Sequence, residues 1–321
     1  MRIGIVGYGR LGRSLEMIAE QDKSVETVGV FTRRNISDVK TLGAKVLSFG
    51  ALSEYRDGID VLCLCHGSSH DLPSMAPSIA AAFNTVDAYD NHNDIEVYKG
   101  SMDRAARNSG HTSLISVGWD PGFLSLIRFY SATFIPDAIT NTFWGRGVSQ
   151  GHSEAIRAID GVKKAVQYTV PREEALTLAG LVRHPLSATD RHRRVCYVVA
   201  EKEKEDLIKR EILTMPSYFI GYETEIHFIT DEEFDRYHTS HSHRGRVYTL
   251  GASGRYKENK HSLFLDLDIG SNPDLTASIM LASARAAYKL NGKKHFGAYS
   301  VFDVPPSYFL PFNYENANYY L

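Results

Sequence analysis

The 321-residue chain has few cysteines, no long apolar run and almost no net charge. Its three cysteines are too few, and odd in number, for a disulfide framework, which favours a reducing compartment. No stretch approaches the roughly 18 consecutive apolar residues of a membrane span. The chain opens on a strand-like segment rather than a signal peptide, and its formal net charge of −2 does not favour nucleic acid or a membrane as partner. We therefore expect a cytoplasmic protein that binds neither.

Residues 1–118 alternate short apolar segments with helical patterns, which predicts a Rossmann-type, doubly wound parallel sheet. We expect its strands at residues 3–6, 25–31, 61–65, 85–87 and 113–116. Helices are expected between them at residues 11–20, 71–83 and 95–108. The fold class is therefore α/β.

The pattern changes over residues 119–293, where strands become amphipathic: Leu263, Leu265 and Leu267 alternate with mostly polar residues. This predicts a second, α+β domain with one open antiparallel or mixed sheet and helices on one side. Its strands are expected at residues 139–144, 195–199, 223–228, 247–252 and 262–268, followed by a helix at 273–290. We expect residues 294–321 to complete the first domain.

A glycine-rich turn lies between the first expected strand and helix, and consists of Gly7, Tyr8, Gly9, Arg10, Leu11 and Gly12. In this position the first glycine permits a tight turn and the second lets the backbone approach a pyrophosphate. The third lets the helix pack close to the sheet. The alternative is an ordinary turn that binds nothing. The position after a strand and before a helix favours a dinucleotide site.

The residues at the end of the second expected strand indicate whether the dinucleotide is NAD or NADP. An Asp or Glu about 20 residues after the glycines would bind the ribose hydroxyls of NAD. This chain has Thr32, Arg33 and Arg34 there instead, and guanidinium groups pair with phosphate. We therefore predict NADP, with these residues around its 2′-phosphate; the alternative is a solvated pair of surface arginines.

The loop after the third long apolar segment leaves the carboxyl edge of the sheet, where ligands bind in such folds. We expect it to contact the ribose and nicotinamide, and it consists of His66, Gly67, Ser68 and Ser69. Cys63 and Cys65, just before it, have a spacing that could indicate a metal site. Since no second cysteine pair accompanies them, we expect small buried side chains and no metal.

Two carboxylates and two indoles occur in segments that contain more polar residues than a loop needs: Asp90, Asp120, Trp119 and Trp144. The segments 87–92 and 118–122 follow strands of the first domain and therefore reach the edge where the dinucleotide is expected. Carboxylates beside aromatic rings suit a cationic amino group. The pattern therefore favours an amino acid as substrate.

Several segments of the chain resemble those of the meso-diaminopimelate dehydrogenase family. The similar stretches extend over nearly the whole length, from residue 4 to about residue 278, and the final segment, residues 307–321, shows no such match. They are VGYGRLGRS, VFTRR, LCHGSSHDLP, VDAYDNHNDI, SVGWDPGF, TFWGRGVSQGHSEA, GVKKAVQYT, TMPSYFIGYE and NPDLTAS.

The resemblance implies reversible, NADP-dependent oxidative deamination at the D-centre of meso-2,6-diaminopimelate. The products are L-2-amino-6-oxopimelate (tetrahydrodipicolinate) and ammonia, in the biosynthesis of lysine and peptidoglycan. It also implies a homodimer without a metal, in which residues 119–293 form the dimerisation and substrate-binding domain. The resemblance assigns six residues to the reacting D-centre: Asp90, Trp119, Asp120, Trp144, Gln150 and Gly151. It assigns four residues to the distal L-centre: Thr169, Arg194, His243 and Asn272.

The chemistry needs a base, because the substrate amine must be neutral before hydride leaves and water must then be activated. We expect Asp120 or, second, Asp90 to be that base. An alternative for Asp120 is to cap the helix that follows Pro121. Another NADP-dependent D-amino acid dehydrogenase, a related sugar or dihydrodipicolinate reductase, and a non-catalytic NADP-sensing protein remain as alternative functions.

Three histidines, His238, His241 and His243, could alone indicate a metal site or a surface loop. The resemblance favours His243 as a substrate ligand and the other two as loop residues. The chain departs from the family pattern at His66, Arg244 and Arg246, which concerns specificity rather than reaction class.

Overall fold

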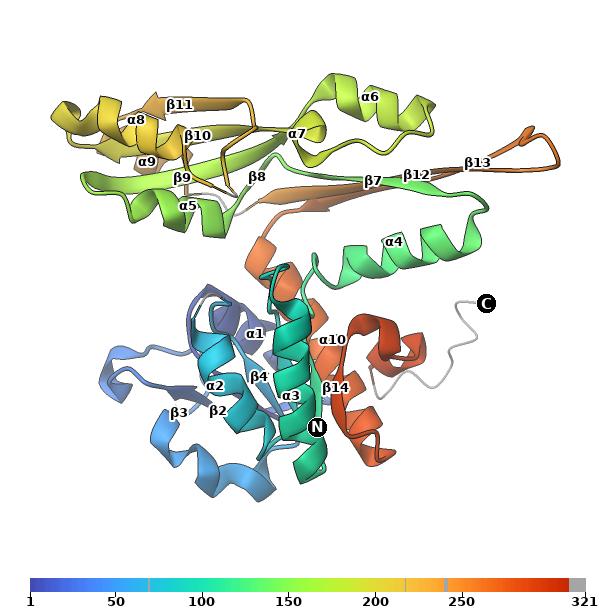
Figure 1. Cartoon of the computed structure of the whole chain (residues 1–321). Coiled ribbons are helices and arrows are strands. Elements are labelled where there is room, and N and C mark those ends of the chain that lie inside the picture. Colours follow the sequence, from blue (N-terminus) through green and yellow to red (C-terminus); the bar gives the residue numbers. More distant parts are fainter. Residues whose placement is uncertain (69, 217, 240–241, 312–321) are drawn as a thin grey trace. The chain divides into compact units, whose positions relative to one another are not determined.

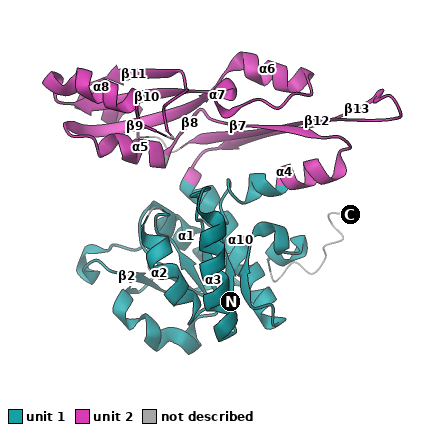
Figure 2. Cartoon of the chain, in the orientation of Figure 1, with its two compact units in different colours: residues 1–126, 273–321 teal, residues 127–272 magenta. Residues whose placement is uncertain are grey.

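The computed structural model describes residues 1–68, 70–216, 218–239 and 242–311. The chain forms two compact units: unit 1 contains residues 1–126 and the chain from residue 273, and unit 2 contains residues 127–272 (Figure 2). This division differs from the expected boundaries after residues 118 and 293. The reason is helix α10 (Asn272–Gly292), whose Ala277, Met280 and Ala284 pack with Ile3 and Ile5 in the core of unit 1.

Unit 1 is built on a seven-stranded sheet in the order β14-β6-β5-β4-β1-β2-β3, with every pair parallel (Figure 1). The expected Rossmann-type parallel sheet is therefore confirmed. Its strands are β1 (Arg2–Val6), β2 (Glu26–Thr32), β3 (Val46–Ser48), β4 (Val61–Leu64), β5 (Thr85–Asp87), β6 (Thr112–Leu114) and β14 (Gly297–Tyr299).

Helices cover both faces of this sheet because its strands are apolar on both faces, as β4 shows with four buried residues. Helices α1 (Arg10–Glu20) and α10 pack on one face. Helices α2 (Asp71–Ala80) and α3 (Ile95–Ser109) pack on the other. Four 3-10 helices complete the unit: η1 (Ile36–Asp38), η2 (Phe49–Gly58), η4 (Val301–Asp303) and η5 (Pro306–Phe309).

The strands of unit 2 divide into two sheets, where the sequence predicted one. A mixed sheet has the order β11-β10-β9-β8, and an antiparallel sheet has the order β13-β12-β7. Strand β9, which the sequence analysis did not identify, pairs with β10, while β7 pairs with β12. The strands are β7 (Ile139–Trp144), β8 (Gly147–Val148), β9 (Val162–Pro171), β10 (His192–Ala200), β11 (Thr224–Phe228), β12 (His243–Ser253) and β13 (Asn259–Ile269).

The mixed sheet of unit 2 carries helices on both faces, not on one side as expected. Helices α5 (Gln150–Arg157) and α8 (Glu205–Leu213) share an apolar core with β9 and β10, and α9 (Asp231–Tyr237) contacts the opposite face through Phe234. Helix α6 (Glu173–Leu181) covers the antiparallel sheet through Leu176 and Phe143. The remaining elements are α4 (Phe123–Phe134), α7 (Ala188–Arg191) and η3 (Lys202–Lys204). In the described ranges, no helix has the length and apolarity needed to cross a membrane.

Candidate active site

The glycine turn of unit 1 has the backbone geometry that its glycines were expected to provide. Gly7 has a φ of +91°, which L side chains rarely adopt. A Cβ on Gly12 would lie 2.2 Å from the carbonyl oxygen of Gly7, so only glycine allows helix α1 this close to the turn. A Cβ on Gly9 would meet no atom within 4 Å. A side chain would therefore clash at Gly7 or Gly12, whereas the space beside Gly9 is open.

Helix α1 begins at Arg10, with Leu11 and Gly12 next in its first turn. Its N-cap is Gly9, which has no side chain to bond the first N–H groups, and the first turn contains no acidic residue. Those N–H groups and the positive end of the helix dipole are thus available to an anion. The turn therefore fits the pyrophosphate of a dinucleotide.

The two arginines after β2 have different partners. The Arg34 side chain donates a hydrogen bond of 2.5 Å from Nη2 to the carbonyl oxygen of Tyr8, and its backbone N–H donates to Thr32 Oγ1 at 3.1 Å. Arg33 forms an ion pair of 2.7 Å with Asp71, at the start of α2. Arg34 is therefore attached to the glycine turn itself, whereas Arg33 lies toward the next loop.

Glu16 is a residue that the sequence analysis missed. It is almost fully buried, and its carboxylate accepts the Tyr8 hydroxyl as well as the backbone N–H groups of Leu42, Gly43 and Ala44 at 3.0, 2.9 and 2.8 Å. Burial by itself raises the pKa of Glu16, but these four donors outweigh burial and the pKa is lowered. Glu16 thus joins the glycine turn to the loop after β2. The available signal was an acidic residue beside Leu15 on the buried face of α1.

The loop after β4 packs against the same turn. The ring of His66 is so close to Gly7 that a Cβ there would lie 2.7 Å from its Cε1 atom. Burial lowers the pKa of His66, which keeps the ring neutral at neutral pH. Gly67 is exposed, and Ser68 Oγ accepts the backbone N–H of Asp90 at 3.1 Å; Ser69 lies outside the described residues.

Cys63 and Cys65, just before this loop, differ in burial. Cys63 is fully buried, and Cys65 Sγ lies 3.9 Å from Met280 Sδ. Both thiols are free; Cys63 is a small buried side chain as expected, whereas Cys65 is half-buried.

Asp87, at the end of β5, anchors the two segments that contain the predicted carboxylates. It is fully buried and accepts the Tyr98 hydroxyl at 2.7 Å and the backbone N–H groups of Tyr89 and Ser116 at 3.0 and 3.2 Å. Burial raises its pKa to about 6. Because Tyr89 precedes Asp90 and Ser116 precedes the Asp120 loop, Asp87 determines where both segments leave the sheet. The sequence analysis did not assign it this role.

The Asp120 loop is a tight turn. The Gly118 N–H donates to the Pro121 carbonyl at 2.8 Å, and the Gly118 carbonyl accepts the Phe123 N–H at 2.9 Å. Gly122 has a φ of +126°, and a Cβ there would lie 2.0 Å from the Gly118 oxygen. Trp119 is buried beside Asp120. Since β5 and β6 are adjacent, Asp90 and Asp120 follow neighbouring strands at the carboxyl edge of the sheet.

Unit 2 brings together three of the four residues predicted for a distal site. Arg194 on β10 and Thr169 on β9 are paired across the mixed sheet, and Arg194 Nη1 donates to Thr169 Oγ1 at 2.6 Å. The guanidinium lies 4.1 Å from the centre of the Tyr222 ring. The third residue, His243, packs its ring on Gly147, whose backbone is paired with Thr169. Thr169, Arg194 and His243 are all largely buried.

The charge of Arg194 is not balanced by a carboxylate. Burial lowers the pKa of Arg194, yet a guanidinium remains protonated at any ordinary pH. Its contacts are with Thr169 and Tyr222, and it forms no ion pair with a carboxylate in the described parts of the chain. A buried cation of this kind suits a ligand that brings its own carboxylate.

Trp144, at the end of β7, is held by a histidine that the sequence did not reveal. Its backbone N–H donates to His192 Nε2 at 3.0 Å, and His192 Nδ1 lies 3.3 Å from the Ala188 carbonyl. Burial lowers the pKa of His192 to about 3, so the ring is neutral and its Nε2 remains an acceptor. Gln150 and Gly151 begin helix α5, and the side chain of Gln150 lies outside the described residues. Asn272 begins helix α10.

His238 and His243, the two histidines of the cluster that the structure describes, have separate environments. His238 stacks on Tyr197 at 4.0 Å and is hydrogen-bonded to Tyr168 at 3.1 Å, whereas His243 packs on Gly147. His241 lies outside the described residues. No group of three or more potential metal ligands is present among the side chains that the structure describes.

Arg244 and Arg246, which depart from the family pattern, both contact Asp266 on β13. Arg244 forms two hydrogen bonds of 2.6 Å with its carboxylate, and Arg246 lies 3.2 Å from it. Asp268, whose carboxylate lies 3.3 Å from Arg244 Nε, is the second carboxylate that balances these two charges across the antiparallel sheet.

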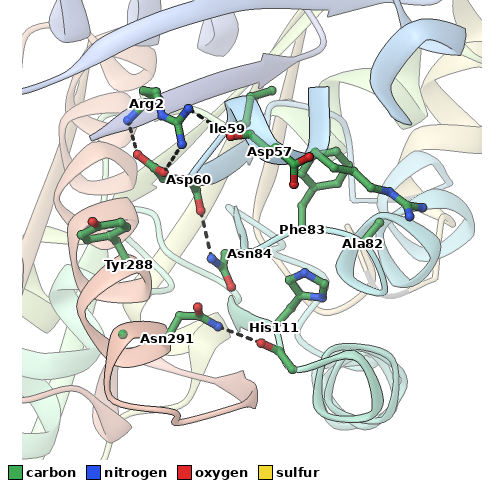
Figure 3. A pocket seen from close by; sticks show the side chains of 13 residues that line it. Arg2, Asp57, Ile59, Asp60, Ala82, Phe83, Asn84, His111, Tyr288 and Asn291 are labelled. Atoms are coloured by element: carbon green, nitrogen blue, oxygen red, sulfur yellow. Dashed lines mark hydrogen bonds and ion pairs between the residues drawn. The ribbon is translucent and has the colours of Figure 1, made fainter. Parts of the chain in front are cut away.

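A cavity of about 370 Å³ lies at the opposite, amino edge of the unit 1 sheet (Figure 3). Its polar groups bond one another: Arg2 donates to Asp60 at 2.8 Å, Asn84 Nδ2 to the Asp60 carbonyl at 2.9 Å, and Asn291 Nδ2 to the Gly110 carbonyl at 3.0 Å. None of the predicted site residues lines this cavity. It is therefore not the candidate active site.

The chain is similar to known proteins over nearly its whole length. Residues 118–270 match the family model described as the diaminopimelic acid dehydrogenase C-terminal domain. A protein of Acetivibrio thermocellus named meso-diaminopimelate D-dehydrogenase is 47% identical over 315 residues, covering 97% of this chain and 94% of the relative.

Two solved structures are similar to the chain. The Corynebacterium glutamicum diaminopimelate dehydrogenase in complex with diaminopimelate has a TM-score of 0.92 and 42% identity, covering 98% of this chain and 96% of that one. An engineered D-amino acid dehydrogenase bound to NADP+ has a TM-score of 0.88 and 39% identity, covering 99% and 97%.

Proposed function

This chain belongs to the meso-diaminopimelate dehydrogenase family, and from that premise we propose its reaction. It catalyses the reversible, NADP-dependent oxidative deamination of the D-centre of meso-2,6-diaminopimelate to L-2-amino-6-oxopimelate and ammonia. The chain is thus an amino acid dehydrogenase of lysine and peptidoglycan precursor biosynthesis. The observation that carries the substrate assignment is the buried Arg194–Thr169 pair, whose cation has no protein carboxylate among the described residues.

NADP is the cofactor, and it supplies the hydride acceptor when it is bound. The open space beside Gly9 and the uncapped start of α1 fit its pyrophosphate. Arg33, Arg34 and Thr32 would hold the 2′-phosphate at the end of β2, which ends in Thr32 and not in an Asp or Glu. His66, Gly67, Ser68 and Ser69 would border the ribose and nicotinamide.

Arg194, Thr169 and His243, with Asn272, would hold the distal L-centre. The substrate carries a carboxylate at that end, and the fixed N–H groups of a guanidinium match a carboxylate geometrically. Burial strengthens the interaction, because little water competes for the same groups. The distal site therefore selects a substrate with a second amino acid head, which a simple D-amino acid lacks.

Asp120 and Asp90 would act at the reacting D-centre, beside Trp119, Trp144, Gln150 and Gly151. A carboxylate first accepts a proton from the substrate ammonium, which leaves a neutral amine whose α-carbon can release hydride. A carboxylate then accepts a proton from the water that attacks the imine carbon, which gives a carbinolamine. Its nitrogen takes a proton from a protonated carboxyl and leaves as ammonia, while its hydroxyl gives its proton to a carboxylate and becomes the 6-oxo group. We assign the base to Asp120 before Asp90.

We further infer a cytoplasmic homodimer that binds neither nucleic acid nor membrane. The free thiols of Cys63, Cys65 and Cys196 and the small net charge of −2 support this setting. A dimer is supported by β13, the edge strand of the antiparallel sheet, where Leu263, Leu265 and Leu267 are only half-buried.

The test is NADP reduction with meso-diaminopimelate, compared with the L,L and D,D isomers and with simple D-amino acids. We expect NADPH formation only with the meso isomer. Comparable rates with simple D-amino acids would favour a general D-amino acid dehydrogenase. NADP binding without turnover of any of these compounds would favour an NADP-sensing protein.

A further inference from the structure

Gln167 on β9 is fully buried, yet neither atom of its carboxamide has a hydrogen-bond partner among the described residues. The backbone N–H and carbonyl of Gln167, in contrast, both form hydrogen bonds. The N–H donates to Ser153 Oγ and the carbonyl accepts the Ser149 N–H, both at 3.0 Å. A buried polar group without a partner is unfavourable, and such groups in native proteins commonly have a functional explanation. An apolar side chain would suit the surrounding core of Ile156 and Val198 better.

The position of Gln167 connects it with the distal site. It is two residues from Thr169 on the same strand, so both side chains lie on the same face of the mixed sheet. The strand register pairs Thr169 with Arg194 and Gln167 with Cys196. Gln167 is therefore the diagonal neighbour of Arg194, a spacing that long side chains can bridge.

Arg194 has a complementary unpaired atom. Its Nη1 donates to Thr169, but its buried Nε has no partner in the described parts of the chain. Nε–H is a donor and the carboxamide oxygen of Gln167 is an acceptor. These two groups on neighbouring strands would satisfy each other after a change of rotamer.

His152, at the start of α5, lies in the electrostatic field of Arg194 but carries no charge of its own. It interacts electrostatically with Arg194, and its Nδ1 is hydrogen-bonded to Ser149. Burial lowers the pKa of His152 to about 3, with Arg194 as the second cause. The imidazole is therefore neutral and adds no second cation.

We propose that Gln167 is a positioning residue for Arg194: in the substrate complex its carboxamide oxygen accepts a hydrogen bond from Arg194 Nε–H. Thr169 holds one Nη atom, Gln167 holds Nε, and the remaining N–H groups are directed to the distal carboxylate. This inference rests on the proposed function, since it assigns the orientation of the residue that recognises that carboxylate.

Two substitutions test the proposal through their effect on substrate binding. Gln167→Met keeps the size of the side chain but removes the acceptor, and we expect KM for meso-diaminopimelate to rise roughly fivefold with little change in kcat. Gln167→Glu places a carboxylate beside Arg194 that competes with the distal carboxylate of the substrate. We expect KM to rise by about a hundredfold. The dissociation constant of NADP should not change in either variant.

The matched control is Val166→Ala, a buried change on the same strand that faces the opposite side of the sheet. It measures the effect of a weakened core, and its KM should remain near that of the wild type. If Gln167→Glu does not fold, Gln167→Met alone decides. KM values within twofold of the wild type in the folded Gln167 variants, or an equal rise in Val166→Ala, overturn the proposal. A wild-type enzyme inactive on meso-diaminopimelate would instead refute the proposed function.

Discussion

Arg194 and Thr169 face each other across strands β10 and β9, and the Arg194 guanidinium donates a hydrogen bond of 2.6 Å to the Thr169 hydroxyl. The hydrogen bond follows from the strand register, which places both side chains on one face of the sheet. The same register directs Arg193 to the opposite face, where it pairs with Glu225. Two adjacent arginines thus have different environments, and only Arg194 lacks a carboxylate partner among the described residues.

Arg194→Met should raise KM for meso-diaminopimelate by roughly a hundredfold, because a charged hydrogen bond to a carboxylate contributes about 1.5–3 kcal/mol. Thr169→Val should raise it by about fivefold, since a neutral hydroxyl contributes less. Steady-state kinetics of both variants measures the effect. Arg193→Met is the control, and a similar KM rise in that variant would contradict the assigned distal site.

Replacing Arg33 and Arg34 together with alanine should raise KM for NADP by one to two orders of magnitude and leave KM for NAD almost unchanged. The physical reason is the loss of the cations next to the 2′-phosphate, which NAD lacks. Arg107→Ala is a suitable control, because Arg107 forms an exposed pair with Asp103 on α3. Equal effects on both dinucleotides would remove the arginines from cofactor selection.

Asp120→Asn should reduce kcat by at least about a hundredfold, the size of a typical general-base contribution, while NADPH binding is retained. Asp90→Asn should have a smaller effect if the order of the two carboxylates is right. Turnover is measured by NADPH formation, and binding by fluorescence titration. Asp94→Asn, in the same segment as Asp90, is the control; near-normal turnover of Asp120→Asn would exclude it as the base.

Asp87 should make the unfolding free energy depend on pH. Burial raises its pKa to about 6 from the ordinary value of 3.8, so the folded protein prefers the protonated carboxyl. The stabilisation is fully present below the unfolded pKa and is lost as pH rises through the folded pKa. Between about pH 4 and about pH 7 the wild type should therefore lose roughly 3 kcal/mol relative to Asp87→Asn, which does not titrate. Urea unfolding across this range measures the difference, and parallel pH profiles would contradict the assignment.

Local pattern was sufficient for much of unit 1. The glycine turn, the arginines after β2 and the alternation of strands and helices are short-range features, and they predicted the parallel sheet and the nucleotide edge. Strand β9 was missed although Val166, Tyr168 and Val170 alternate with the polar Gln167 and Thr169, so a local strand pattern was present. The single sheet expected in unit 2 was wrong because the pairing that separates β7 and β12 from β9 and β10 is a long-range property.

The burial of Asp87, Gln167 and His192 also had no clear sequence signal. Asp87 accepts the backbone N–H of Ser116, 29 residues away, and His192 accepts that of Trp144, 48 residues away. A propensity or a spacing cannot reveal such partners, because they depend on which segments meet in space.

By itself the sequence determined the glycine turn, the arginines that we predict to select NADP and membership of the family, since all of these depend on contiguous motifs. The tertiary structure alone decided that Thr169, Arg194 and His243 meet, because they lie on three different strands and strand register is a long-range property. It also decided that the Arg194 cation is buried without a carboxylate among the described residues. Because its charge has no such partner, Arg194 is a candidate binding residue for the carboxylate of a ligand.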